Sequence, residues 1–302
     1  MKELSIVIPV YNSENSIKKL IEKLSVDLIG IDFEVILVND GSKDNSEKVC
    51  IELSQSYKNL TFISLRRNFG EFSAVMCGLN HVTGRYAVMI DDDFQNPPSE
   101  ITKLLEKAKQ GNFDVVYSQY AQKKHSPFRN FGSWMVNKLN DYLIGKPNDL
   151  YLSSFKLINF ETVSEIIKYQ GPYPYIDALI FRVTDNVSKV YVEHSNRQEG
   201  KSGYSIKKLI SLFLNVLFGY SQLPIRILWA IGLLLILCWF LLFSVLLITS
   251  KIDVQMLLWL ALMLLVSFQF FFIGILGEYI GKAFLQQGGK PQYVIKKVYK
   301  AS

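Results

Sequence analysis

The chain has 302 residues, a formal net charge of +6 and 49% hydrophobic residues, enough for one large domain or a domain with an appendage. Its basic residues are spread out and many flank apolar segments, so the expected partner is a lipid bilayer with anionic head groups rather than nucleic acid. The three cysteines, Cys50, Cys77 and Cys238, fit no metal-site spacing, and we expect reduced thiols.

Short apolar runs alternate with helical patterns over the first 120 residues. The apolar runs predict strands at residues 4–10, 33–38, 60–65, 85–90 and 113–119. The helical patterns fall at residues 13–28, 43–56, 70–82 and 98–110. This alternation, with strands buried on both faces, predicts an α/β fold in which helices cover a parallel sheet.

Three polar clusters follow strands of this predicted sheet. They read YNSE at 11–14, NDGS at 39–42 and DDD at 91–93. Each cluster alone is ordinary turn chemistry. Ligands of such sheets bind outside the carboxyl ends of the strands, so three clusters at one edge predict a binding site.

The aspartate cluster predicts a metal ion. The sequence has neither a G-x-x-x-x-G-K-[ST] phosphate loop nor a G-x-G-x-x-G turn after its first strand, so a bound diphosphate needs another positive charge. Asp91 and Asp93 lie two residues apart on an extended segment, and Gln95 adds an oxygen on the same side. Mg²⁺ or Mn²⁺ prefers such oxygen ligands and commonly bridges carboxylates to substrate phosphates.

Two uncharged runs predict a membrane anchor. Residues 227–250 and 254–277 are each about 24 residues long, enough to cross a bilayer core of about 30 Å, and three residues separate them. The positive flanks of this hairpin, and the lack of an N-terminal signal peptide, predict a cytoplasmic soluble domain and cytoplasmic termini. Residues 205–220 read as a helix lying in the membrane interface.

Four motifs in this order resemble the glycosyltransferase family 2 catalytic domain with its GT-A fold. They are IVIPVYNSENSI, VNDGSKDNS, RRNFG and DDDFQNPPSEI. The D-x-D-x-Q form, the two apolar runs and GEYIG at 277–281 resemble the polyprenyl-phosphate glycosyltransferase branch, which acts on undecaprenyl or dolichyl phosphate. The resemblance implies a GT-A domain at 1–204, an interfacial region at 205–225, a transmembrane hairpin at 226–282 and a cytoplasmic tail at 283–302.

The resemblance also implies a donor site. The first loop would hold the nucleoside, Asp40 would contact the base, and Asp92 stands where the family more usually has a small residue. The implied nucleotide-sugar-binding residues are Pro9, Tyr11, Glu14, Asp40, Asp91 and Asp92. The implied metal ligands are Asp91, Asp93 and Gln95. Whether Asp92 tightens the metal site or points away stays open at this point.

An acceptor site follows from the same resemblance. HSNRQEGKSGY at 194–204 resembles the R-x-x-G-x-S-[KG]-Y segment of the branch, and arginine meets phosphate oxygens in pairs. Ser154-Phe155-Lys156 stands where many relatives carry Asp-Phe-Arg, so the positive charge remains and a carboxylate is lost. The implied acceptor or phosphate contacts are Arg129, Lys156, Arg197, Lys201 and Ser202.

The expected reaction is inverting transfer of a single sugar from a nucleotide-sugar, with UDP the expected nucleotide, to undecaprenyl phosphate. It would occur at the cytoplasmic face of a bacterial inner membrane, with Asp93 and Arg197 as catalytic residues. A lipid phosphate is already largely ionised at neutral pH, so it needs little help as a nucleophile. Asp177 is a candidate base or, equally, a structural helix residue.

Two rival functions remain at this stage. A processive polysaccharide synthase would usually carry more membrane helices and a Q-x-x-R-W motif, which this sequence lacks. A catalytically idle membrane scaffold would bind nucleotide without turnover. Gly274, Gly277 and Gly281 allow close helix packing, and we expect a homo-oligomer.

Overall fold

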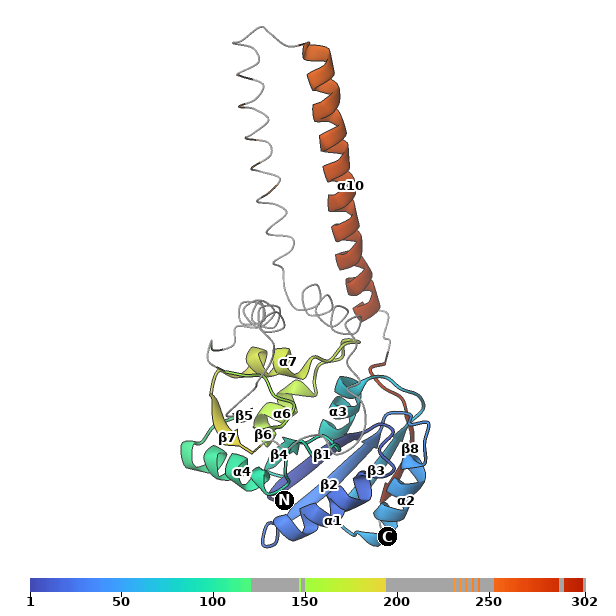
Figure 1. The fold of residues 1–302 in the computed structure, drawn as a ribbon, viewed down its shortest axis with the longest axis vertical. Helices are drawn as coiled ribbons and strands as arrows, with labels where there is room; N and C mark the ends of the chain where they lie inside the picture. The colour runs from blue at the N-terminus through green and yellow to red at the C-terminus, as the bar shows by residue number, and fades with distance from the viewer. Residues whose placement is uncertain are drawn as a thin grey trace. The chain divides into compact units, whose positions relative to one another are not determined.

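The computed structural model of the chain describes residues 1–120, 150–193, 253–287 and 291–300, with Pro147 and five helical positions between 231 and 244. The chain divides into two compact units, and each is described by itself. One unit consists of Met1–Gly203 together with Lys290–Ser302, and the other is Tyr204–Gly289 (Figure 1).

The first unit is built on one sheet of eight strands. In chain order they are β1 (Leu4–Val10), β2 (Phe33–Asn39), β3 (Leu60–Leu65), β4 (Tyr86–Met89), β5 (Val115–Tyr120), β6 (Lys156–Asn159), β7 (Val187–Val192) and β8 (Ile295–Lys300). Their order across the sheet is β7-β5-β6-β4-β1-β2-β3-β8. Strands β6 and β8 run antiparallel to their neighbours, and the other strands run parallel to one another.

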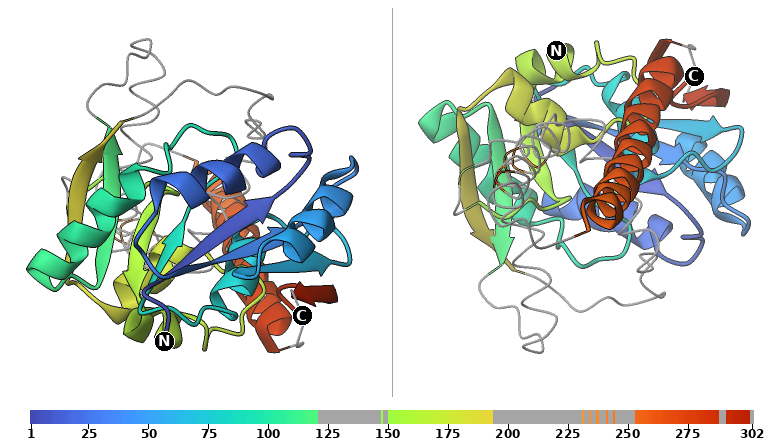
Figure 2. Two further views of the ribbon diagram at one scale, coloured as in Figure 1. Left: turned by 90° about the horizontal axis from the view of Figure 1, so that it is seen from below. Right: turned by 90° about the horizontal axis from the view of Figure 1, so that it is seen from above.

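Helices cover both faces of this sheet. They are α1 (Ile17–Asp27), α2 (Ser46–Ser56), α3 (Glu71–Leu79), α4 (Glu100–Gly111), α6 (Phe160–Ile166) and α7 (Ile176–Val183). Helices α1, α2 and α4 lie on one face, and α3, α6 and α7 lie on the other (Figures 1 and 2). The sheet is therefore the middle of three layers, as the sequence alternation predicts.

Strand β1 shows why the sequence folds this way. Its alternate residues Ile6 and Ile8 join the main core with the apolar stripe of α1, whose buried members recur at helical spacing. Val7 points to the opposite face, where α3 crosses the strand. A Cβ added at Gly78 of α3 would lie 2.3 Å from a methyl of Val7, so only glycine lets the helix approach this closely.

The sheet departs from the predicted parallel arrangement at β6. The first five strands lie where the sequence predicts them, but β6 inserts antiparallel between β4 and β5. Its start therefore lies at the same edge as the carboxyl ends of the parallel strands. The run that forms β6 is only four residues long, which is too short to give a clear periodic signal.

Strand β8 is the second feature that the sequence analysis did not anticipate. Residues 295–300 pair antiparallel with β3 and close that edge of the sheet. Tyr299 stacks on the buried ring of Phe62 with ring centroids 5.4 Å apart, and Lys296 forms a 2.9 Å ion pair with Glu47 of α2. Three of the six residues of β8 are lysines, so its sequence lacks the apolar run that predicts a buried strand. Charged side chains are nevertheless common on exposed sheet edges.

The second unit contains the long helix α10 (Val254–Gln287). Its segment Leu257–Gly281 has a mean hydropathy of 2.3 and is long and apolar enough to cross a membrane. It is the one such helix in the described part of the chain. Most of the other apolar run, 227–250, and all of the expected interfacial helix lie outside the described residues, so the two-helix hairpin stays a prediction.

The β8 edge gives a first prediction. Replacing Tyr299 with Ala removes the ring stacked on Phe62, and we expect the free energy of unfolding to fall by about 1–3 kcal/mol, less than the full cost for a buried aromatic ring because Tyr299 is half-buried. Val298→Ala is the matched control, because Val298 is 38% exposed on the other face of the strand. Thermal or denaturant unfolding in detergent measures both; equal losses would contradict the anchoring role of Tyr299.

Candidate active site

Three polar loops meet at the carboxyl edge of the sheet, and two of them interlock. The first loop, residues 11–14, follows β1, and the second loop, residues 40–45, follows β2. The Asn12 side chain accepts a 2.8 Å hydrogen bond from the Lys43 N–H, and the Asn12 N–H donates to Ser42 Oγ at 3.0 Å. Asn12 has a φ of +56°, which asparagine tolerates better than most residues. The loops thus hold each other in one arrangement.

Glu14 serves this junction directly. Its carboxylate accepts hydrogen bonds from the backbone N–H and the side-chain amide of Asn45, at 2.9 and 2.8 Å. These contacts favour a role in shaping the loops over direct contact with a nucleoside. Tyr11 is 45% exposed, so its ring is accessible to a ligand, and Pro9 lies half-buried within β1.

Asp40 anchors a fourth segment, the arginine loop (residues 66–70). Its buried carboxylate accepts hydrogen bonds from the backbone N–H groups of Phe69 and Gly70, at 2.7 and 2.9 Å. Burial raises the pKa of Asp40, and these two hydrogen bonds oppose that rise. Gly41 has a φ of +65°, and an added Cβ would lie 2.6 Å from the backbone of Arg67. The NDGS cluster therefore binds the backbone of the arginine loop through Asp40 and packs closely against it at Gly41.

The three aspartates after β4 do not point the same way. The Asp92 carboxylate turns toward the first loop, where it accepts hydrogen bonds from the Ser13 hydroxyl and the Tyr11 N–H. Burial raises the pKa of Asp92 to about 6, and the neighbouring charges of Asp91 and Asp93 push it in the same direction. Asp92 therefore points away from Asp91 and Asp93. Its carboxylate connects the aspartate turn to the first loop.

Asp91 and Asp93 are half-buried at the edge itself. Asp93 accepts a 3.1 Å hydrogen bond from the backbone N–H of Gln95, which closes a tight turn around Phe94. Phe94 takes a φ of +59°, an unusual conformation for an aromatic residue that marks this turn as constrained. Among the described residues, no three His, Cys, Asp or Glu side chains form a cage for a metal ion.

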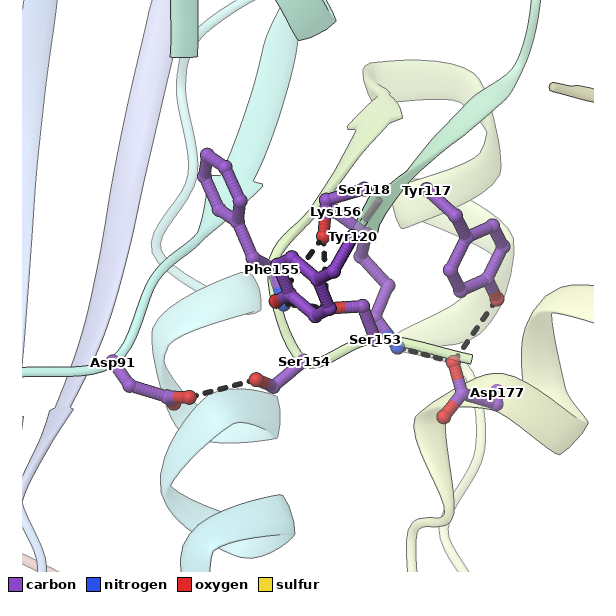
Figure 3. Close-up of polar contacts among 9 residues, drawn as sticks. All are labelled: Asp91, Tyr117, Ser118, Tyr120, Ser153, Ser154, Phe155, Lys156 and Asp177. Atoms are coloured by element: carbon purple, nitrogen blue, oxygen red, sulfur yellow. Dashed lines mark hydrogen bonds and ion pairs between the residues drawn. The ribbon is translucent and has the colours of Figure 1, made fainter. Parts of the chain in front are cut away.

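A buried ion pair lies beside this edge. Lys156 of β6 and Asp177 of α7 are 3% and 6% exposed, and their side chains form a salt bridge (Figure 3). The Tyr117 hydroxyl donates to the same Asp177 oxygen at 3.0 Å, and the Lys156 ammonium lies 5.0 Å from the centre of the Tyr117 ring. Lys156 and Asp177 are thus occupied with each other, which favours the structural role for Asp177.

The residues just before Lys156 were not singled out by sequence as contacts of the aspartates. The Ser154 hydroxyl donates a 2.7 Å hydrogen bond to the Asp91 carboxylate (Figure 3). Ser153 turns the other way and shares hydrogen bonds with Ser118 and Tyr120, at 2.8 and 2.9 Å. Only the strand pairing could have revealed these contacts, because 63 residues separate Ser154 from Asp91.

The remaining predicted phosphate contacts lie outside the described residues. They are Arg129, Arg197, Lys201 and Ser202. Within the described part of the chain, the predicted residues that meet at the carboxyl edge are Tyr11, Glu14, Asp40, Asp91, Asp92, Asp93 and Gln95.

Comparison with protein families now identifies the chain. Residues 5–167 match the family model described as Glycosyl transferase family 2. The chain belongs to glycosyltransferase family 2. The match contains β2 to β6, all of β1 except Leu4, and all three polar loops, so the edge described above lies within the family's characteristic region.

Solved structures agree with this family 2 fold. Glucosyl-3-phosphoglycerate synthase from Mycobacterium tuberculosis, in complex with Mn²⁺, UDP and glucosyl-3-phosphoglycerate, superposes with a TM-score of 0.54 at 18% identity, over 72% of this chain and 78% of that chain. The same enzyme with Mg²⁺ and UDP also gives a TM-score of 0.54 at 18% identity, over 72% and 77% of the two chains. At this identity the likeness shows the fold, a GT-A-like mixed α/β sheet.

The buried ion pair gives the second prediction. Asp177→Asn leaves the Lys156 ammonium buried without its carboxylate, and we expect a loss of about 3–5 kcal/mol in the free energy of unfolding. Asp185→Asn makes the same chemical change at an exposed position and should cost almost nothing. Denaturant unfolding of the two variants in detergent measures the difference. Similar stabilities would show that the pair does not hold α7 to the sheet.

Proposed function

We propose that this family 2 chain transfers one sugar from a UDP-sugar to undecaprenyl phosphate at the cytoplasmic face of a bacterial inner membrane. The product would serve synthesis or modification of a cell-surface glycan. The observation that carries the proposal is the acidic pair Asp91 and Asp93 at the carboxyl edge of a family 2 sheet, in a chain that also contains the apolar segment Leu257–Gly281.

The donor part of the proposal rests on the three loops at that edge. Tyr11 offers an exposed ring to a nucleoside, and Asp40 fixes the arginine loop beside the second loop. The superposed mycobacterial enzyme holds UDP, and one of its complexes holds UDP-glucose. These features support a UDP-sugar as the donor.

The residues at the edge fit a divalent metal ion. Asp91 and Asp93 are half-buried carboxylates, and Gln95 follows in the same turn. Mg²⁺ commonly takes only one or two carboxylates and completes its shell with water and substrate phosphates, so a cage of three acidic residues is not required. When bound, Mg²⁺ or Mn²⁺ would neutralise the diphosphate and stabilise it as a leaving group. The superposed structures contain Mn²⁺ or Mg²⁺ with UDP, which supports this assignment.

The acceptor phosphate would act as its own nucleophile. A phosphate monoester has a second pKa near 6 and is mostly dianionic at neutral pH. The ion pair with Lys156 occupies Asp177, so the proposed reaction uses no protein base. The proposal assigns phosphate binding on the acceptor side to Arg129, Arg197, Lys201 and Ser202, through charge-assisted hydrogen bonds.

The last part of the proposal concerns how the chain is anchored in the membrane. We infer that residues 226–282 form a two-helix hairpin, that residues 205–225 lie in the interface, and that both termini are cytoplasmic. The apolar segment Leu257–Gly281 supports the hairpin, and positive flanks support its orientation. We also propose a homo-oligomer; a monomer in native mass measurements would contradict that assignment.

The third prediction tests the reaction itself. Purified protein in detergent, with Mn²⁺ or Mg²⁺, undecaprenyl phosphate and a panel of radiolabelled nucleotide-sugars, should give one labelled lipid that mild acid cleaves. Asp93→Asn should lower the rate by more than about 100-fold, because even the hydrogen-bonding partners of metal ligands typically contribute about 10- to 100-fold. Asp185→Asn is the control, since Asp185 is exposed and is not part of the proposed site.

A second acceptor arm separates this proposal from its rivals. The superposed enzyme binds phosphoglyceric acid, so 3-phosphoglycerate replaces the lipid in a parallel reaction. Transfer to 3-phosphoglycerate alone would overturn the lipid assignment and keep the glycosyltransferase. A growing polymer would indicate a processive synthase. Metal-dependent UDP binding without any product would favour the idle scaffold.

A further inference from the structure

Ser154 and Asp91 meet just beyond the paired ends of β6 and β4. In the antiparallel pair of β4 and β6, Met89 lies opposite Lys156. Asp91 lies two residues beyond the end of β4, and Ser154 lies two residues before the start of β6, so both follow the last pair of the ladder. Their contact is therefore a product of the sheet register, and the Ser154 hydroxyl meets the Asp91 carboxylate at 2.7 Å.

The residues on both sides of Ser154 are fixed in the fold. Phe155 is fully buried, and its carbonyl accepts a hydrogen bond from the Ser118 N–H of β5 at 3.2 Å. Ser153 binds Ser118 and Tyr120 through its hydroxyl, and the Tyr120 hydroxyl in turn donates to Asn96 at 2.8 Å. Asn96 follows the aspartates in sequence, so this network also ties β6 back to their loop.

Lys156 supplies the second anchor. Lys156 is the first residue of β6 and stands two residues after Ser154. Its ammonium is held by Asp177, which the Tyr117 hydroxyl also contacts (Figure 3). A buried ion pair with an added hydrogen bond is costly to distort. The Ser154 hydroxyl is thus an exposed group on a rigid backbone, well suited to orient a neighbouring side chain.

We infer that Ser154 is a positioning residue for the metal-binding carboxylate of Asp91. Its hydroxyl fixes the orientation of the carboxylate before donor and metal arrive, so less conformational freedom is lost on binding. The inference rests on the proposed function, because it assumes that Asp91 meets a divalent cation bound with a UDP-sugar. It adds a contribution from the segment that leads into β6, which supplies no metal ligand itself.

Metal affinity tests this inference without any turnover. The full-length protein in detergent is titrated with Mn²⁺ at saturating UDP, and free Mn²⁺ is followed by its electron paramagnetic resonance signal. We expect Ser154→Ala to raise the Kd for Mn²⁺ about 10-fold, the lower end of the range for hydrogen-bonding partners of metal ligands. Ser154→Thr keeps the hydroxyl and should stay within about 3-fold of the wild type.

Ser164→Ala is the matched control. It removes a serine hydroxyl that donates to the Glu161 carbonyl within α6, and it should leave the Kd unchanged. Melting temperatures of all variants show whether each protein is folded, and Ser154 is exposed, so its truncation opens no cavity.

The outcomes separate the two claims. A Kd for Ser154→Ala within 2-fold of the wild type would overturn the positioning role and leave the proposed function intact. Equal weakening in Ser154→Ala and Ser154→Thr would also overturn it, because the hydroxyl would not be the cause. A wild type that binds no Mn²⁺ with UDP would overturn the proposed function, and the inference with it.

Discussion

The reversed direction of β6 is the constraint on which the site depends. The parallel strands all deliver their carboxyl ends to one edge, and a parallel insertion between β4 and β5 would have added another loop there. The antiparallel β6 instead delivers its beginning to that edge, so Ser154, two residues before the strand, lies beside Asp91.

The loops at the edge are ordered by hydrogen bonds to three carboxylates. Glu14 joins the first and second loops, Asp40 joins the second loop to the arginine loop, and Asp92 joins the aspartate turn to the first loop. Each of these carboxylates accepts backbone N–H groups, which stabilise its charge in place of water. The acidity of the edge thus divides into carboxylates that build the loops and two, Asp91 and Asp93, that are half-buried at the proposed metal site.

The sequence predicted those strands and helices that have a clear pattern of apolar residues within their own segment. Strands β1 to β5 and the helices between them follow from apolar periodicity, and the acidic edge follows from their alternation. The sequence could not show that Glu14 and Asp92 join loops to one another, because the partners of a carboxylate depend on which loops meet. Strand β8 and the contact of Ser154 with Asp91 depend on pairings between segments 63 or more residues apart, which no local pattern reports. The predicted contacts at Arg129, Arg197, Lys201 and Ser202 stay predictions.

The proposed role of Ser154 bears on a departure from the pattern that the family resemblance implies. The family resemblance implies an aspartate at this position, in an Asp-Phe-Arg sequence where this chain has Ser154-Phe155-Lys156. With the β6 register seen here, a carboxylate at 154 would lie within hydrogen-bonding range of Asp91, and two like charges at that distance repel unless a cation lies between them. A serine donates a hydrogen bond instead, so Asp91 is held in place before any metal binds. The substitution therefore exchanges a second negative charge for a fixed donor, and the pair Lys156 and Asp177 keeps that donor in register.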